Sequence, residues 1–218
     1  MMLTASTAIA FGASIVFAPD QASANTPAID KDAAASRSAP TPSTKSNKSA
    51  FHGAFKKVRA EKLDRLFKRL KEAKDAKSGR TVAAQIWSTW MTTGNVELDF
   101  LLRQSQLALQ EGGVAEAYGA LDRVVEMAPD FAEGWNRRAT LHFMMGRYPE
   151  SVADIQQTLA LEPRHFGALS GLGMIYMSRK NWKAALKAFE KAYEVNPWIQ
   201  HGPALMEDLK RRIAGQAL

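Results

Sequence analysis

The 218-residue chain carries hydrophobic residues at helical spacing through most of its length. In residues 63–70, Leu and Phe recur at i, i+3, i+4 and i+7, which is one face of a helix with 3.6 residues per turn. A similar apolar face occupies residues 82–91, after the break at Gly79. The pattern therefore predicts a helical hairpin over residues 55–97.

Beyond residue 97 the pattern repeats, because Pro129, Pro163 and Pro197 follow one another at intervals of 34 residues. Counting back from each proline gives three repeats, 98–131, 132–165 and 166–199. Small residues stand at the eighth and twentieth positions of every repeat, where they allow two helices to approach closely. They are Ser105, Ala117, Ala139, Ser151, Gly173 and Ala185.

The third repeat shows the pattern most fully: Leu172-Gly173-x2-Tyr176, then Ala185-x3-Phe189, then Pro197. This spacing resembles the tetratricopeptide repeat, a 34-residue helix–turn–helix unit. The resemblance implies an all-α, right-handed superhelical solenoid of antiparallel helix pairs. It also implies that residues 55–97 form a degenerate N-terminal repeat that caps the stack, and that residues 200–218 form a C-terminal capping helix.

The family resemblance implies binding and not catalysis, with the first helix of each repeat lining a concave groove. We expect a partner segment to lie there, held by apolar contacts and oriented by polar side chains. The implied groove residues are Leu102, Arg103, Gln106, Leu109, Asn136, Arg137, Thr140, Phe143, Ser170, Met174 and Met177.

Each implied groove residue also has a purely structural interpretation. The methionines fill gaps between helices in many proteins. Arg137 is a candidate anchor for an acidic group of a ligand, but it also stands four residues after Glu133 on the same predicted helix. One subclass of the family clamps the carboxylate of a chaperone tail with Lys, Asn and Arg. The matching positions here are Leu102, Gln106, Arg137, Gly167 and Gly171, which excludes that function.

The net charge of +7 is concentrated in the predicted hairpin. Residues 51–97 hold 11 basic and 5 acidic side chains, whereas the three repeats hold 11 basic and 12 acidic ones. Two interpretations stay open: a solvated helix face with alternating charges, or a surface that docks on an anionic membrane or envelope polymer. We expect no nucleic-acid partner.

No reaction centre is indicated by the sequence. The chain contains no cysteine, and none of its four histidines has a ligand-spaced partner on one helix face. Phosphate-binding loops and nucleophile motifs are also missing. We therefore predict a protein that is not an enzyme, with no catalytic residues, no metal and no cofactor.

Residues 1–24 have the pattern of an export signal. The apolar run 3–18 is followed by Pro19 and by an Ala-x-Ala site that ends at Ala24. We expect cleavage after Ala24 and a periplasmic location, with an uncleaved membrane anchor as the alternative. Residues 25–54 are rich in Ser, Ala, Pro and Lys and are predicted to be a disordered linker. The sequence thus favours an envelope scaffold that binds a protein or peptide, or else a non-catalytic subunit of an envelope enzyme complex.

Overall fold

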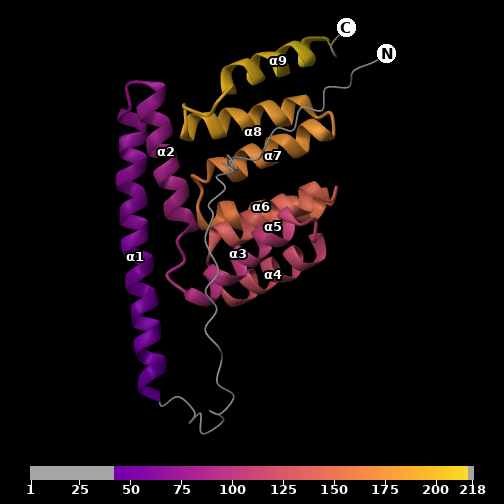
Figure 1. Cartoon of the computed structure of the whole chain (residues 1–218). Coiled ribbons are helices and arrows are strands. Elements are labelled where there is room, and N and C mark those ends of the chain that lie inside the picture. The colour runs from indigo at the N-terminus through magenta and orange to yellow at the C-terminus, as the bar shows by residue number, and fades with distance from the viewer. Residues whose placement is uncertain (1–41, 216–218) are drawn as a thin grey trace, which may run out of the picture.

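The computed structural model describes residues 42–215, with side chains from residue 54 onward. Within that range it contains nine α-helices and no strand (Figure 1). This arrangement confirms the predicted all-α solenoid of helix pairs. The helices are α1 (Pro42–Glu72), α2 (Ala76–Met91), α3 (Val96–Gln110), α4 (Val114–Met127), α5 (Ala132–Met144), α6 (Tyr148–Leu161), α7 (Phe166–Ser178), α8 (Trp182–Val195) and α9 (Gly202–Gly215).

Six of these helices form the three stacked units. Each unit pairs a first helix (α3, α5 or α7) with a second helix (α4, α6 or α8), and successive units pack on one another (Figure 1). The small residues lie where the two helices of a unit meet. Ser151 Oγ donates a 2.7 Å hydrogen bond to the backbone oxygen of Ala139. At Gly173 an added Cβ would lie 2.7 Å from the ring of Phe189, so only glycine fits without a shift.

The turn inside each unit places one residue in the left-handed region. Gly112 (φ 81°) and Gly146 (φ 73°) occupy it in the first two units, where glycine carries no Cβ penalty. The third unit uses Lys180 (φ 56°) at the same point. Between units, the helices end just before the prolines, which have no N–H with which to continue them.

The C-terminal end of the stack is covered by α9, which packs against α8 and buries Leu209 completely. Its opposite face carries Asp208, whose carboxylate pairs with Arg211 and Arg212. The end of a solenoid requires such a helix, with an apolar face that covers the last unit and a charged face that meets solvent.

The hairpin of α1 and α2 does not stack on the first unit, so the prediction of a degenerate N-terminal repeat is wrong. The two helices run alongside the stack and across its helices, with α2 on the inner side (Figure 1). They contact the loops between units over the whole length of the solenoid. The physical reason is side-chain size. Lys71 stands where a repeat needs a small residue, and Trp87 and Trp90 of α2 pack instead on His165 and Phe166 at the start of the third unit.

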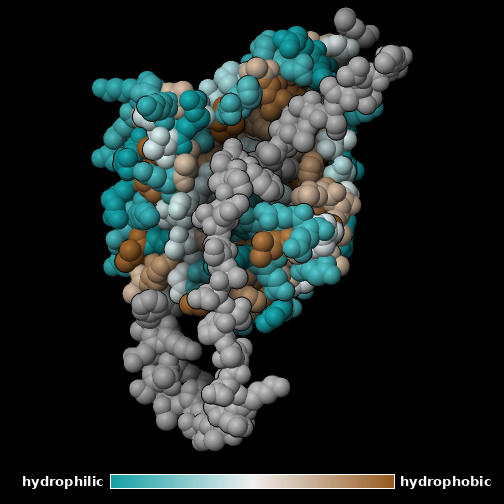
Figure 2. Space-filling view, in the orientation of Figure 1, coloured by the Kyte–Doolittle hydropathy of each residue, from teal (hydrophilic) through white to brown (hydrophobic). Residues whose placement is uncertain are grey.

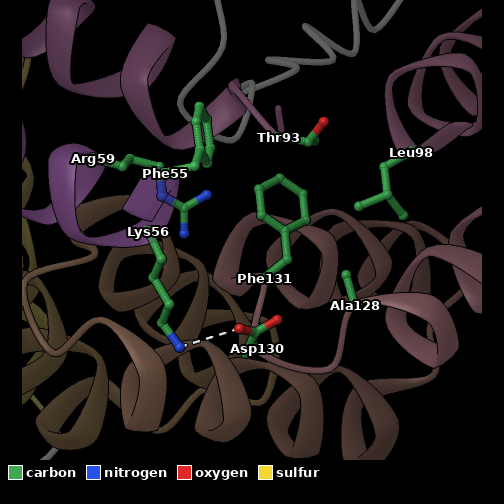
Figure 3. Close-up of a pocket in the computed structure, with 8 residues that line it drawn as sticks. All are labelled: Phe55, Lys56, Arg59, Thr93, Leu98, Ala128, Asp130 and Phe131. Carbon is green, nitrogen blue, oxygen red and sulfur yellow. Dashed lines mark hydrogen bonds and ion pairs between the residues drawn. The ribbon is translucent and has the colours of Figure 1, made fainter. Parts of the chain in front are cut away.

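Long side chains hold the hairpin to the first unit. Lys56 forms a 3.1 Å ion pair with Asp130, and the guanidinium of Arg59 lies over the ring of Phe131 at 5.5 Å (Figure 3). Arg59 also donates to the backbone oxygen of Thr92, and burial lowers its pKa. The cavity left between these groups and Thr93 has a volume of about 20 Å³, room for about one water molecule.

The predicted linker is also corrected at one end. α1 begins at Pro42, so residues 42–54 are helical and not part of a linker. Once a helix has formed through packing, extending it adds one hydrogen bond per residue without a new nucleus. Residues 25–41 and the predicted signal, 1–24, lie outside the described residues. No helix in the described range is long and apolar enough to span a membrane.

Candidate partner-binding groove

The groove formed by the first helices is partly filled by α2. Trp90 of α2 stacks on His165 with ring centroids 4.0 Å apart and an interplanar angle of 13°. Trp87 meets His165 and Phe166 edge-on at 5.4 and 5.5 Å. Gly167 lies directly beneath the indole ring of Trp87, since a Cβ added at Gly167 would lie 2.7 Å from Cζ2 of that ring. The second position of the third repeat is therefore closed by the chain itself.

A buried polar network continues from this contact into the second unit. The backbone N–H of Ala168 donates to Nδ1 of His165 at 3.1 Å, which leaves the ring proton on Nε2. That Nε2–H donates to Oε2 of Glu133 at 3.1 Å, and Asn136 Nδ2 donates to the same oxygen at 3.0 Å. Glu133 is only 4% exposed, so these hydrogen bonds replace the water that its carboxylate lost.

Arg137 completes this network and is not a free anchor. Its Nε donates to Oε1 of Glu133 at 3.3 Å, and its Nη2 contacts Sδ of Met91 on α2. Its side chain is 21% exposed. The structural interpretation, a pair with Glu133 on the same helix, is the one that the structure shows.

The remaining predicted groove residues differ in how far they are buried. Leu102 and Asn136 are buried, and Ser170 is half-buried with its hydroxyl bonded to the backbone oxygen of Phe166. Arg103 and Gln106 on α3 are exposed. Toward the C-terminal ends of the first helices, the half-buried residues are Leu109, Thr140, Phe143, Met174 and Met177.

Each apolar residue of this half-buried group also packs between helices. Phe143 packs on Tyr148 with centroids 5.7 Å apart. Met174 and Met177 pack against the cluster around Phe189 and Leu209. Their inner atoms therefore fill gaps in the stack while their outer atoms line the groove. The space-filling view shows further hydrophobic surface between α8 and α9, at the top (Figure 2).

Sequence reasoning missed one structurally important residue, Arg138, whose hydrogen bonds join the first two units. It donates 2.8 Å hydrogen bonds from Nε and Nη2 to Asp154 and one of 2.6 Å from Nη1 to Asp122. These hydrogen bonds, led by those to Asp154, raise its pKa. Both acidic residues lie 16 positions from Arg138, one on each side, and that symmetric spacing was the available signal.

His142 lies beside this ion pair in the position where the repeat pattern usually has tyrosine. Its Nε2 is 3.7 Å from Asp154, and its side chain is 4% exposed. Burial lowers its pKa, because the charged imidazolium would lose its hydration, although Asp154 acts in the opposite direction. Its ring meets that of Tyr118 edge-on at 5.4 Å, so we assign the histidine to packing. Within residues 54–215 no group of three metal-ligating side chains occurs.

Comparisons with known proteins agree with this geometry. The family model described as tetratricopeptide repeat matches residues 102–155 and residues 137–197. A TPR repeat-containing protein of Rhizobium etli is 35% identical over 155 residues, which cover 71% of this chain and 76% of that protein. Superkiller complex protein 3 of Homo sapiens is 40% identical over 63 residues, which are 29% of this chain and 4% of that protein.

Solved structures share the fold at lower identity. The Sgt2 TPR domain from Aspergillus fumigatus is 22% identical, with a TM-score of 0.52 over 56% of this chain and 83% of that one. The first TPR of RPAP3, solved with an HSP90 peptide, is 17% identical, with a TM-score of 0.51 over 54% of this chain and 94% of that one.

Proposed function

Because this chain belongs to the tetratricopeptide repeat family, we propose that it is a non-catalytic module that binds a segment of a partner protein. The site is the part of the groove that the hairpin leaves uncovered. Proteins of this family are interaction modules, and the RPAP3 domain was solved with a peptide of HSP90. The proposal for this chain adds where the partner lies and which side chains hold it.

The observation that carries the proposal is a row of half-buried apolar residues at equivalent positions of three successive first helices. Leu109, Phe143 and Met177 stand at the twelfth position of their repeats. Gln106, Thr140 and Met174 form a parallel row one helical turn earlier. A segment crossing the three helices would meet polar groups on α3 and apolar ones on α7. Flexible methionines suit such a surface because they repack around different side chains.

The hairpin fixes one edge of this site. Trp87, Trp90 and Met91 cover the N-terminal ends of α5 and α7, so a partner has access only to the C-terminal halves of the first helices. The usable groove is therefore narrower than in a bare solenoid. We expect its ligand to be a short segment and not a long helix.

The test is crosslinking in cells with benzoylphenylalanine placed at Gln106, which is exposed beside the row. We expect one dominant partner, which a Phe143→Glu/Met174→Glu variant loses while its circular dichroism is unchanged. The matched control is Met127→Glu/Leu161→Glu, which places the same charges on 42% and 40% exposed positions of second helices. Equal crosslinking by the groove variant and the wild type would refute the site.

The envelope location is part of the same proposal and is supported by the apolar run and the Ala-x-Ala site of residues 1–24. Mass spectrometry of the protein from its native cells is expected to find Asn25 as the first residue. A protein that retains residues 3–18 and sediments with membranes would favour the anchored alternative.

A further inference from the structure

A wide cleft lies away from the groove, between α1 and the C-terminal ends of α6 and α8. Its volume is about 750 Å³, within the range of about 300–1,000 Å³ that ligand pockets occupy. Here α1, which packs on α2, stands beside the second and third units and is tied to them by the ion pair between Asp64 and Arg164. Six of its residues carry the argument: Phe67, Leu169, Lys68, Lys71, Arg164 and Lys191.

The floor of the cleft is apolar. Phe67 and Leu169 are 5% and 8% exposed, so only a small part of each side chain faces the cleft. The guanidinium of Arg164 lies 4.4 Å from the centre of the Phe67 ring. Its hydrogen bonds to Glu162 and Asp64, the latter at 2.7 Å, fix that position. The charge of Arg164 is therefore already compensated.

The rim, in contrast, carries three lysines that form no ion pair within the described residues. Lys68, Lys71 and Lys191 are exposed, and none forms an ion pair with an acidic side chain of residues 54–215. Glu194 is the single acidic residue among those that line the cleft. Three ammonium groups thus surround an apolar floor, which favours a ligand with carboxylates and at least one apolar group.

We propose that this basic cleft binds a short acidic segment of a partner protein, with carboxylates at the three lysines and an apolar side chain against Phe67 and Leu169. A flat bilayer would meet the lysines but could not reach the floor between two helical walls. The site is lined by α1, by the ends of α6 and α8 and by the loop and first turn that begin α7, and it includes none of the proposed groove residues. It therefore goes beyond the proposed groove and acts independently of it.

The experiment is fluorescence anisotropy of the full chain with the fluorescein-labelled peptide Leu-Glu-Glu-Leu-Glu-Glu. We expect saturable binding that weakens as salt is raised, and no binding of the matched peptide Leu-Gln-Gln-Leu-Gln-Gln. In Lys68→Glu/Lys71→Glu/Lys191→Glu the affinity should fall about tenfold or more. The control Lys77→Glu/Lys183→Glu/Lys210→Glu changes net charge equally at exposed positions outside the cleft and should retain the affinity.

Three results would overturn the proposal: no binding of the acidic peptide, equal loss in both triple variants, or binding to phosphatidylserine vesicles through the three lysines without peptide binding. Circular dichroism of both variants separates these results from misfolding. The groove variant Phe143→Glu/Met174→Glu should bind the acidic peptide normally. Failure of the groove proposal and failure of the cleft proposal are therefore distinguishable.

Discussion

Trp90 is the residue whose loss should most affect how the hairpin and the repeats are joined. It is 3% exposed and contacts the rings of Phe67, Trp87, His165 and Phe166 at centroid distances of 6.0, 5.2, 4.0 and 5.0 Å. Truncating a buried aromatic residue to alanine typically costs about 3–5 kcal/mol. Trp90→Ala should lower the free energy of unfolding by that amount, because it opens a cavity between α1, α2 and α7 and exposes the Glu133–His165 hydrogen bond.

Trp90→Phe provides a sharper version of the same test. Phenylalanine retains a ring to stack on His165, and such a pair is worth about 0.5–1.5 kcal/mol beyond its buried area. The Trp90 indole N–H is buried without a hydrogen-bond partner among the residues described, and a buried unpaired donor costs about 1–3 kcal/mol. Removing it should offset much of the lost area, so Trp90→Phe should cost less than about 1.5 kcal/mol.

The measurement is urea unfolding followed by circular dichroism at 222 nm, which does not depend on tryptophan emission. The control is Val58→Ala, at a 60% exposed position of the same hairpin, which should change the free energy of unfolding by no more than about 0.5 kcal/mol. The reasoning fails if Trp90→Phe costs as much as Trp90→Ala, or if Trp90→Ala costs no more than the control.

Three further outcomes are expected. Because burial holds the pKa of His142 below its ordinary 6.5, the unfolded chain binds more protons as pH falls through 6.5, so stability should decrease there. His142→Tyr should reduce that pH dependence of urea unfolding, and an unchanged slope would contradict the assignment. Arg138→Ala should destabilise the protein by about 3–5 kcal/mol by leaving Asp154 buried and unpaired, and adding Asp154→Asn should recover part of the loss in a double-mutant cycle. Gly119→Ala, where an added Cβ meets no atom within 4 Å, should raise the melting temperature through a gain of about 1 kcal/mol in helix propensity, whereas Gly173→Ala should lower it.

The sequence predicted the position of the groove residues in the repeats but not their burial. The repeat positions correctly indicated which residues lie along the first helices, but they gave no sign that Gly167 and Asn136 would be covered. Gly167 is covered by Trp87, which the sequence showed only as a member of an apolar helix face, and Asn136 is buried in the hydrogen-bond network around Glu133. Arg137 was open to two interpretations in sequence, and its 3.3 Å hydrogen bond to Glu133 decided between them.

The sequence by itself determined the solenoid, because every contact that defines a repeat joins residues of the same unit or of the next one. The features of a repeat are local in sequence: small residues at fixed positions, prolines every 34 residues and one left-handed residue in the turn of each unit. Only the tertiary structure decided where the hairpin lies. Its contacts join residues 74, 100 and 128 positions apart, in Lys56–Asp130, Asp64–Arg164 and Leu70–Trp198. No periodicity encodes such pairs, since they depend on which surface of the finished stack offers a site that fits two tryptophans.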